Sequence, residues 1–211
     1  MKNKGIISSF YAPLTRIIHE GWAVLFPANY AGYFYRKTSN KELNLKDPRD
    51  YNEKLEWLKI YSDTSQWTEC ADKYKVRNYI RKCGLEHILT DLYGVWKDPD
   101  EIDFSGLPDK FVLKANHGFG KTILVRNKSE LDIAETRLTL KKWLKDRYGL
   151  MTFEPHHWNI ERRILAEELL QDDFNTSLSS SLIDYKFWCV NGERSEEHTA
   201  ELQSRQSTSS A

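Results

Sequence analysis

The part of the sequence with the clearest chemical potential is a glycine-bearing loop between two apolar runs. Residues 116–121 read Asn-His-Gly-Phe-Gly-Lys, and Lys114 stands just before them. Glycine lets backbone amides approach a phosphate closely, and lysine supplies the opposite charge. The pattern therefore suits a flap over the phosphates of a nucleotide, although on this pattern alone an ordinary glycine hairpin with an exposed lysine is the favoured interpretation.

The same loop is not a P-loop, although Gly-Lys-Thr at 120–122 resembles the end of one. A P-loop needs an earlier glycine, where this chain has Ala115, and a helix that starts after the lysine and directs its amides at the phosphates. Here Thr122 is followed by Ile-Leu-Val, which favours a strand. We therefore expect a hairpin of two antiparallel strands, over 111–114 and 122–125.

Two other groups of residues suggest metal binding at first sight. His156 and His157 are adjacent, but neighbouring histidines on an irregular segment are expected to point apart, and neither a carboxylate nor a cysteine stands at ligand spacing. The acidic pairs at 98–100 and 172–173 lie in turn-like contexts. A loop is the favoured interpretation of the histidines, and the sequence predicts no metal ligand.

Composition excludes several classes of protein. The 211 residues include 31 basic and 31 acidic side chains, and this zero balance argues against a dedicated nucleic-acid or anionic-membrane surface. Three widely spaced cysteines without a CxxC predict reduced thiols, and no apolar run approaches the ~20 residues that span a bilayer. We expect a cytoplasmic protein whose aromatic-rich residues 10–36 pack as helices, with weak peripheral membrane contact as the alternative.

The helices that must support the loop follow from apolar spacing. Tyr51, Leu55 and Leu58 at i, i+4 and i+7 predict a helix from Asp50 to about Tyr61. A second helix is expected from Asp72, a good N-cap, to Gly84 as the residue after its end.

Further elements follow the same rules. A charged helix is expected over about 129–148, ended by Gly149. Residues 88–96 show no clear helical or strand pattern and are expected to form an irregular segment. Residues 163–170 fit either a strand or a helix. Residues 183–190 read as a strand that ends in a hairpin turn at Asn191-Gly192, close to where the native-looking sequence stops.

Several ordered blocks resemble ATP-grasp proteins of the teichuronopeptide-biosynthesis type, which act in polysaccharide biosynthesis and are often labelled glycosyltransferases. The blocks, spread over about residues 40–193, are Asn52-Glu53-Lys54-Leu55, Ala71-Asp72-Lys73-Tyr74, Leu107-Pro108-Asp109-Lys110-Phe111-Val112-Leu113-Lys114, Asn116-His117-Gly118, Ala166-Glu167-Glu168 and Asp184-Tyr185-Lys186-Phe187. The resemblance implies an α+β ATP-grasp fold, in which two lobes hold ATP between antiparallel sheets.

The resemblance also implies a reaction. ATP, with Mg²⁺, activates a carboxylate as an acyl phosphate, and an amine then attacks it to give an amide. The expected acceptor is a saccharide or peptide that bears a carboxylate, on a cell-surface polymer. A glycosyltransferase of capsular or cell-wall polysaccharide synthesis is one alternative, for which the acidic pairs at 98–100 and 172–173 are candidates, and a degenerate nucleotide-binding protein is another.

Site residues carry over position by position. Lys114 resembles the lysine that contacts the α- and β-phosphates, and the loop over the phosphates corresponds to Asn116, His117, Gly118 and Gly120. Glu167 and Glu168 lie in a segment similar to the one that holds adenine, with a charged strand edge as the alternative. Lys186 is expected to reach phosphate or substrate, or else to form a cross-strand ion pair. Lys73 is either a rim contact or a surface lysine. No catalytic residue is assigned.

The domain prediction combines the resemblance with a change in composition after Gly192. We expect an N-terminal helical segment over 1–45, an N-terminal lobe over 46–110, an incomplete nucleotide-binding lobe over 111–193, and a non-native or disordered tail over 194–211. The tail has one large apolar residue and resembles a translated sequencing adapter. The expected chain is therefore truncated in its C-terminal lobe, lacks the Mg²⁺ ligands and turns over weakly or not at all.

Overall fold

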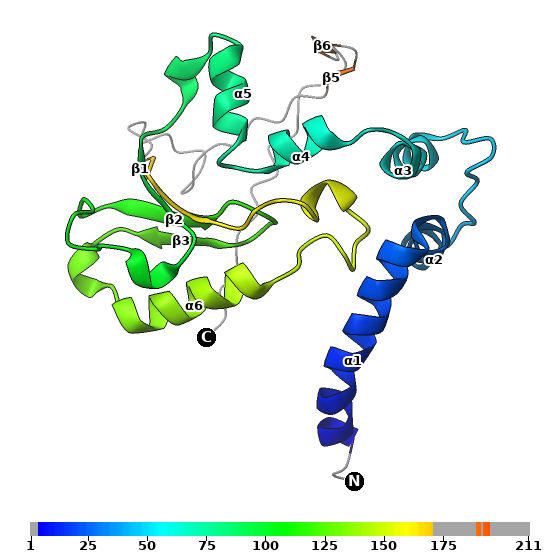
Figure 1. Ribbon diagram of the computed structural model, residues 1–211, viewed down its shortest axis with the longest axis horizontal. Helices are drawn as coiled ribbons and strands as arrows, with labels where there is room; N and C mark the ends of the chain where they lie inside the picture. The colour runs from blue at the N-terminus through cyan, green and yellow to red at the C-terminus, as the bar shows by residue number, and fades with distance from the viewer. Residues whose placement is uncertain (1–3, 171–188, 191, 195–211) are drawn as a thin grey trace, which may run out of the picture. The chain divides into compact units, whose positions relative to one another are not determined.

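The computed structural model describes residues 4–170, 189–190 and 192–194 (Figure 1). The chain divides into two compact units, Met1–Leu169 and Leu170–Ala211. The first unit contains a four-stranded antiparallel sheet with helices before and between its strands. The expected α+β class is confirmed.

The first unit begins with two helices, α1 (Lys4–Leu25) and α2 (Pro27–Ser39). The break at Pro27 follows from its ring, which fits the first turn of a helix and not the interior. The buried Tyr30 of α2 packs with Phe153, which lies far along the chain. Among the described residues, no helix is both long enough and apolar enough to cross a bilayer.

Helix α3 (Tyr51–Tyr61) starts where the sequence predicted. Asp50 is its N-cap: its carboxylate accepts the Glu53 amide at 2.9 Å, and the Glu53 carboxylate accepts the Asp50 amide at 3.4 Å. A reciprocal cap of this kind stabilises a helix by about 1 kcal/mol. The apolar stripe that predicted α3 is not buried, since no residue of the helix is.

Within the second predicted helix, from Asp72 to Gly84, the structure has the shorter α5 (Val76–Lys82), and it adds α4 (Ser65–Ala71), which was not predicted, before Asp72. Asp72 lies between them, buried, and its carboxylate accepts the backbone amides of Tyr74 and Lys75 in a turn. The prediction that the helix starts at Asp72 is therefore wrong by four residues, because this carboxylate caps a turn before α5. The glycine at the end is correct: Gly84 has φ +72°.

The sheet has the order β1-β4-β2-β3, and all neighbours are antiparallel. Its strands are β1 (Leu92–Trp96), β2 (Phe111–Ala115), β3 (Thr122–Val125) and β4 (Ile164–Glu167). The predicted hairpin of β2 and β3 is confirmed, with Lys114 opposite Thr122. Strand β3, and not a helix, directly follows Lys121, which removes the P-loop interpretation.

Strand β1 was not predicted, because residues 88–96 read as a looser segment. The pairing with β4 shifts register between Leu92 and Gly94, so apolar and polar residues do not alternate there. A Cβ at Gly94 would lie 2.1 Å from the Trp96 ring, so a larger residue there would force this ring to move. Strand β4 resolves the ambiguity over 163–170, and it pairs with both β1 and β2.

Helix α6 (Ile133–Lys145) begins after Asp132, whose side chain accepts the Glu135 amide at 2.9 Å. It is shorter than expected, since it ends at Lys145 and not near Tyr148. Helix α6 lies along the sheet (Figure 1), and its buried Leu140 belongs to the core that also contains Phe111 and Leu113 of β2. Short 3-10 turns complete the unit: Glu86–Ile88, Pro99–Glu101, Lys128–Glu130 and η4 (Pro155–His157).

The second unit contributes a hairpin of β5 (Cys189–Val190) and β6 (Glu193–Arg194). Its turn contains Gly192 with φ +81°, as a hairpin turn at Asn-Gly requires. The rest of the predicted strand, 183–188, and the expected tail after Arg194 lie outside the described residues.

In the first unit, β1 and β4 come from opposite sides of the expected domain boundary at 110/111 and join one sheet.

Candidate functional site

Lys114 and Glu167 meet on one face of the sheet. Val112 lies opposite Glu167 and Lys114 opposite Leu165, so the two charged side chains are diagonal neighbours on adjacent strands. Lys114 Nζ lies 2.7 Å from Glu167 Oε2. The Glu167 side chain is 7% exposed and that of Lys114 is 30% exposed, so the carboxylate holds a lysine that still reaches solvent.

Arg77 pairs with the other oxygen of the Glu167 carboxylate. Arg77 was not assigned to the site from the sequence. Its Nη1 lies 3.6 Å from Glu167 Oε1, and its Nη2 donates to the Thr90 carbonyl at 2.5 Å. Both Arg77 and Glu167 are buried. Helix α5 reads Val-Arg-Asn-Tyr-Ile-Arg-Lys, and nothing in this pattern distinguishes the buried Arg77 from the exposed Arg81.

Asn116 is fully buried at the start of the loop. Its amide nitrogen donates to Asp72 Oδ1 at 2.8 Å and to the Glu161 carbonyl at 2.9 Å, and its oxygen accepts the Arg163 amide at 2.7 Å. Both N–H donors are therefore used inside the protein. The Asn116 side chain joins the loop to the turn before α5 and to the entry of β4, which suits positioning of the loop.

The two loop glycines adopt left-handed backbone conformations, with φ +75° at Gly118 and +74° at Gly120. A Cβ at Gly118 would lie 2.7 Å from the Tyr148 ring and 2.9 Å from Lys121 Nζ, whereas one at Gly120 would meet nothing within 4 Å. Phe119 between them is 78% exposed. The loop is thus closed on the side of Tyr148 and open at Gly120.

Three lysines surround this loop. Lys73 donates from Nζ to the Gly118 carbonyl at 2.6 Å, and it is half-buried, unlike a surface lysine. Burial lowers the pKa of Lys73, and the positive charges of Lys114 and Lys121 lower it further. Lys121 Nζ lies 2.7 Å from Asp146 Oδ2 and 5.0 Å from the centre of the Tyr148 ring. Three cations around a loop that is open at Gly120 can attract a polyphosphate.

His117 is part of the loop, but its side chain is buried, and only 2% of the residue's surface is exposed. Burial, followed by the positive charges of Lys121 and Arg162, lowers its pKa to about 4. His117 is therefore neutral at pH 7, and it cannot act there as a cationic phosphate ligand.

The remaining predicted site residues differ in placement. Glu168 follows Glu167 at the end of β4, and its backbone amide donates to the Asp91 carbonyl at 2.9 Å beside β1. Successive residues of a strand face opposite sides, so Glu168 does not share the face of Lys114. Lys186 lies outside the described residues.

Two expectations are wrong here: that His156 and His157 point apart, and that no carboxylate lies at ligand spacing from them. Their ring centroids lie 4.5 Å apart, and one ligand atom from each of Glu154, His156 and His157 lies within 4.8 Å of the others. The 3-10 turn η4 brings the two rings together, and Glu154 directly precedes it. Burial lowers the pKa of both histidines, that of His157 to about 4. However, Glu154 already accepts the Thr152 hydroxyl at 2.5 Å.

The described residues do not fit a Mg²⁺ site beside the loop. Mg²⁺ prefers oxygen ligands in a near-octahedral array. The two carboxylates closest to the loop lysines, Glu167 and Asp146, are each held by two cationic side chains. No step is therefore assigned to Mg²⁺. The glycine loop and its lysines, in contrast, fit the phosphates of a nucleotide.

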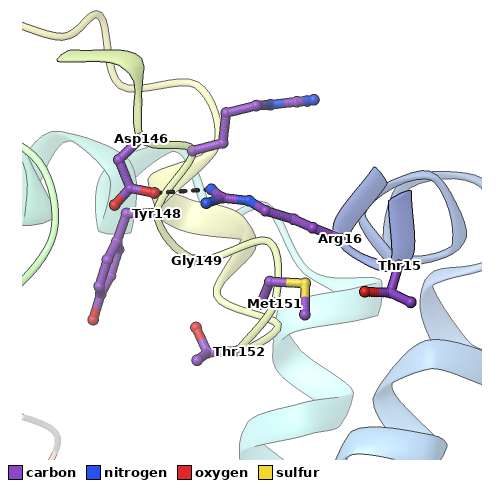
Figure 2. A pocket seen from close by; sticks show the side chains of 8 residues that line it. Thr15, Arg16, Asp146, Tyr148, Gly149, Met151 and Thr152 are labelled. Carbon is purple, nitrogen blue, oxygen red and sulfur yellow. Dashed lines mark hydrogen bonds and ion pairs between the residues drawn. The ribbon is translucent and has the colours of Figure 1, made fainter. Parts of the chain in front are cut away.

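A pocket of about 300 Å³ lies beside the loop lysine Lys121 and its partner Asp146 (Figure 2). It is formed by the N-terminal helix α1 and the segment after α6. Its lining residues are Thr15, Arg16, Asp146, Arg147, Tyr148, Gly149, Met151 and Thr152.

Comparison with known proteins gives one result. A family model described as TupA-like ATPgrasp matches residues 53–198. This range contains Lys73, Lys114, Lys121 and Glu167 but excludes helices α1 and α2. No curated protein and no protein of solved structure shows a significant match to the chain.

Proposed function

The chain belongs to the TupA-like ATP-grasp family, and we propose that it is an ATP-dependent carboxylate–amine ligase of cell-surface polysaccharide biosynthesis. The single observation that supports the nucleotide site is that Lys73 and Lys121 lie against a loop with two left-handed glycines, while Lys114 stands in the strand β2 that leads into this loop. Family membership supports an enzyme that uses ATP. We further propose that it works in the cytoplasm, where ATP is available.

The proposed site would hold ATP mainly by charge and by backbone amides. Lys114 reaches the phosphates from the sheet, and its ammonium is fixed at 2.7 Å from Glu167. Lys121 approaches from the loop end of the hairpin, just before β3, and Lys73 from the turn before α5. Gly120, with open space where a Cβ would be, lets the backbone come close to a phosphate oxygen.

The proposed reaction has two steps. A carboxylate oxygen of the acceptor attacks the γ-phosphorus, the bond from that phosphorus to the bridging oxygen breaks, and ADP leaves. An amine then attacks the acyl carbon, phosphate leaves with the electron pair of the broken C–O bond, and the amine loses a proton. Both steps depend on positioning and on neutralising phosphate charge, which the three lysines can supply.

The acceptor is proposed from family resemblance as a uronic acid or a peptide carboxylate on a surface polymer. The glycosyltransferase alternative gains no support from its candidate acidic residues. Asp98 accepts the Asp100 amide at 2.9 Å, and Asp100 pairs with Lys141 at 2.5 Å, so both already have structural partners. The second acidic pair, 172–173, lies outside the described residues.

Nucleotide binding separates the alternatives. Isothermal titration of the full 211-residue chain with ATP, and in parallel with UDP-glucose, is expected to give binding of ATP alone. Binding of UDP-glucose alone would favour the glycosyltransferase, and binding of neither would favour a degenerate protein. Acyl phosphate can then be trapped with hydroxylamine in the presence of ATP, Mg²⁺ and glucuronate; hydroxamate in excess of a Lys114→Met control would support the ligase.

A further inference from the structure

Asp146 is shared between the loop lysine and the N-terminal helix. Its Oδ2 lies 2.7 Å from Lys121 Nζ, and its Oδ1 lies 2.8 Å from Arg16 Nη2. Figure 2 shows the Arg16 side chain reaching across from α1 to this carboxylate. Burial alone would raise the pKa of Asp146, but the hydrogen bonds from Lys121 and Arg16 outweigh it, so the group stays ionised.

Arg16 is itself held in place. Its Nε lies 2.8 Å from Glu20 Oε1 one turn along α1, and Glu20 Oε2 accepts from Arg147 Nη1 at 3.1 Å. The Glu20 side chain is 8% exposed, so this second carboxylate is a buried anchor. The guanidinium therefore spans two carboxylates, one on its own helix and one on the segment that follows α6.

Lys121 is also restricted by its surroundings. Its side chain is 10% exposed and lies over the Tyr148 ring. This ring lies so close to Gly118 that a Cβ there would clash with it. A nucleotide phosphate that approaches the loop must compete with Asp146 for this ammonium. The strength of the Asp146–Lys121 pair therefore determines how much of the Lys121 charge is available to the phosphate.

We propose that Arg16 is a positioning residue of the nucleotide site, which acts through Asp146 on Lys121. Arg16 takes part of the Asp146 charge, so Lys121 is held in place without being neutralised. The proposal rests on the proposed function, because it concerns the same nucleotide site. It also adds a residue from outside the range that the family model matches, 53–198.

The proposal predicts opposite signs for two substitutions. Arg16→Ala leaves Asp146 to Lys121 alone and removes one positive charge, so the Kd for ATP should rise about threefold to tenfold. Asp146→Asn removes the competing negative charge, so the Kd should fall by a similar factor. In the double variant the loss of Arg16 should change the Kd less than about twofold, because its route to Lys121 is gone.

A purely structural role gives a different pattern. If Arg16 and Asp146 only join α1 to the rest of the unit, both substitutions weaken ATP binding and lower the melting temperature together. If Arg16 instead acts through its charge, as proposed, Arg16→Lys should keep a Kd for ATP close to that of the wild type. Arg36→Ala is the matched control, since Arg36 forms an exposed ion pair with Glu42 at 3.0 Å on α2 and is expected to leave the Kd unchanged.

The measurement is isothermal titration of the full chain with ATP at two ionic strengths, with thermal unfolding of each variant. If Asp146→Asn fails to fold, the Arg16→Ala, Arg16→Lys and Arg36→Ala series still decides the matter. Wild-type binding of ATP with an unchanged Kd for Arg16→Ala would overturn the inference and leave the proposed function intact. Absence of ATP binding by the wild type would overturn both.

Discussion

Lys114 and Glu167 lie 53 residues apart in the sequence, yet their charged groups meet at 2.7 Å on adjacent strands of the sheet. The pair is asymmetric, since the carboxylate is buried and the ammonium partly exposed. Arg77 approaches the same carboxylate from the opposite oxygen. Glu167 is thus the centre of a buried charge group whose partly exposed member, Lys114, lies in the strand that leads into the loop.

Glu167→Gln is expected to destabilise the fold. It leaves the buried guanidinium of Arg77 without its carboxylate, and loss of one partner of a buried ion pair typically costs about 3–5 kcal/mol. Urea unfolding measures the change in the free energy of unfolding. Glu168→Gln is the matched control and should change it by less than about 0.5 kcal/mol. Equal effects from the two would contradict the buried charge group.

Lys114→Met is expected to separate binding from stability. Arg77 still pairs with Glu167, so the fold should lose only about 1 kcal/mol, whereas ATP should bind more than about tenfold more weakly. Titration with ATP and urea unfolding test the two effects. Lys110→Met, an exposed lysine just before β2, is the control and should alter neither. Unchanged ATP binding by Lys114→Met would remove Lys114 from the site.

Local features were predictable because they depend on neighbours in the sequence. The β-branched run after Thr122 and the glycines of the loop predict the hairpin, and the cap at Asp50 predicts the start of α3. Strand β1 was not predictable by the same means. Its register shift and partial exposure remove the alternation that marks a strand.

The support of the site could not be predicted, because it depends on contacts between distant residues. Asp72 has the type and context of a helix cap, and nothing nearby indicates that it accepts the Asn116 amide 44 residues on. Arg77 and Glu167 are similar, since their pairing requires α5 and β4 to be placed first. The His156–His157 contact required the 3-10 turn η4, which local pattern did not indicate.

Gly118→Ala and Gly120→Ala are expected to differ although both positions have the same backbone conformation. An alanine in the left-handed region costs about 1–2 kcal/mol at either position. At Gly118 the methyl group would also meet the Tyr148 ring, which adds about 1–3 kcal/mol. Urea unfolding should rank Gly118→Ala as the less stable variant. Adding Tyr148→Ala should recover part of that difference, and failure to recover any would mean that the ring does not close the loop.

Stability is expected to fall as the pH falls from about 6.5 to about 4. In the folded state the pKa of His117 and of His157 is lowered from 6.5 to about 4, chiefly by burial. The unfolded chain therefore binds protons in this window that the folded protein does not, so the free energy of unfolding is largest above pH 6.5 and decreases as the histidines are forced to charge. Urea unfolding at pH 7.5, 6, 5 and 4.5 measures this slope.

The slope can be assigned by substitution. His117→Gln keeps a neutral polar side chain that takes up no proton, so it should lower the stability at pH 7.5 while making its decrease between pH 6.5 and 4.5 shallower. His87→Gln removes an exposed histidine of the turn before β1 and should leave the slope unchanged. A slope that is the same in His117→Gln as in the wild type would mean that the pKa of His117 hardly changes on folding, which would contradict the lowered pKa of the buried imidazole.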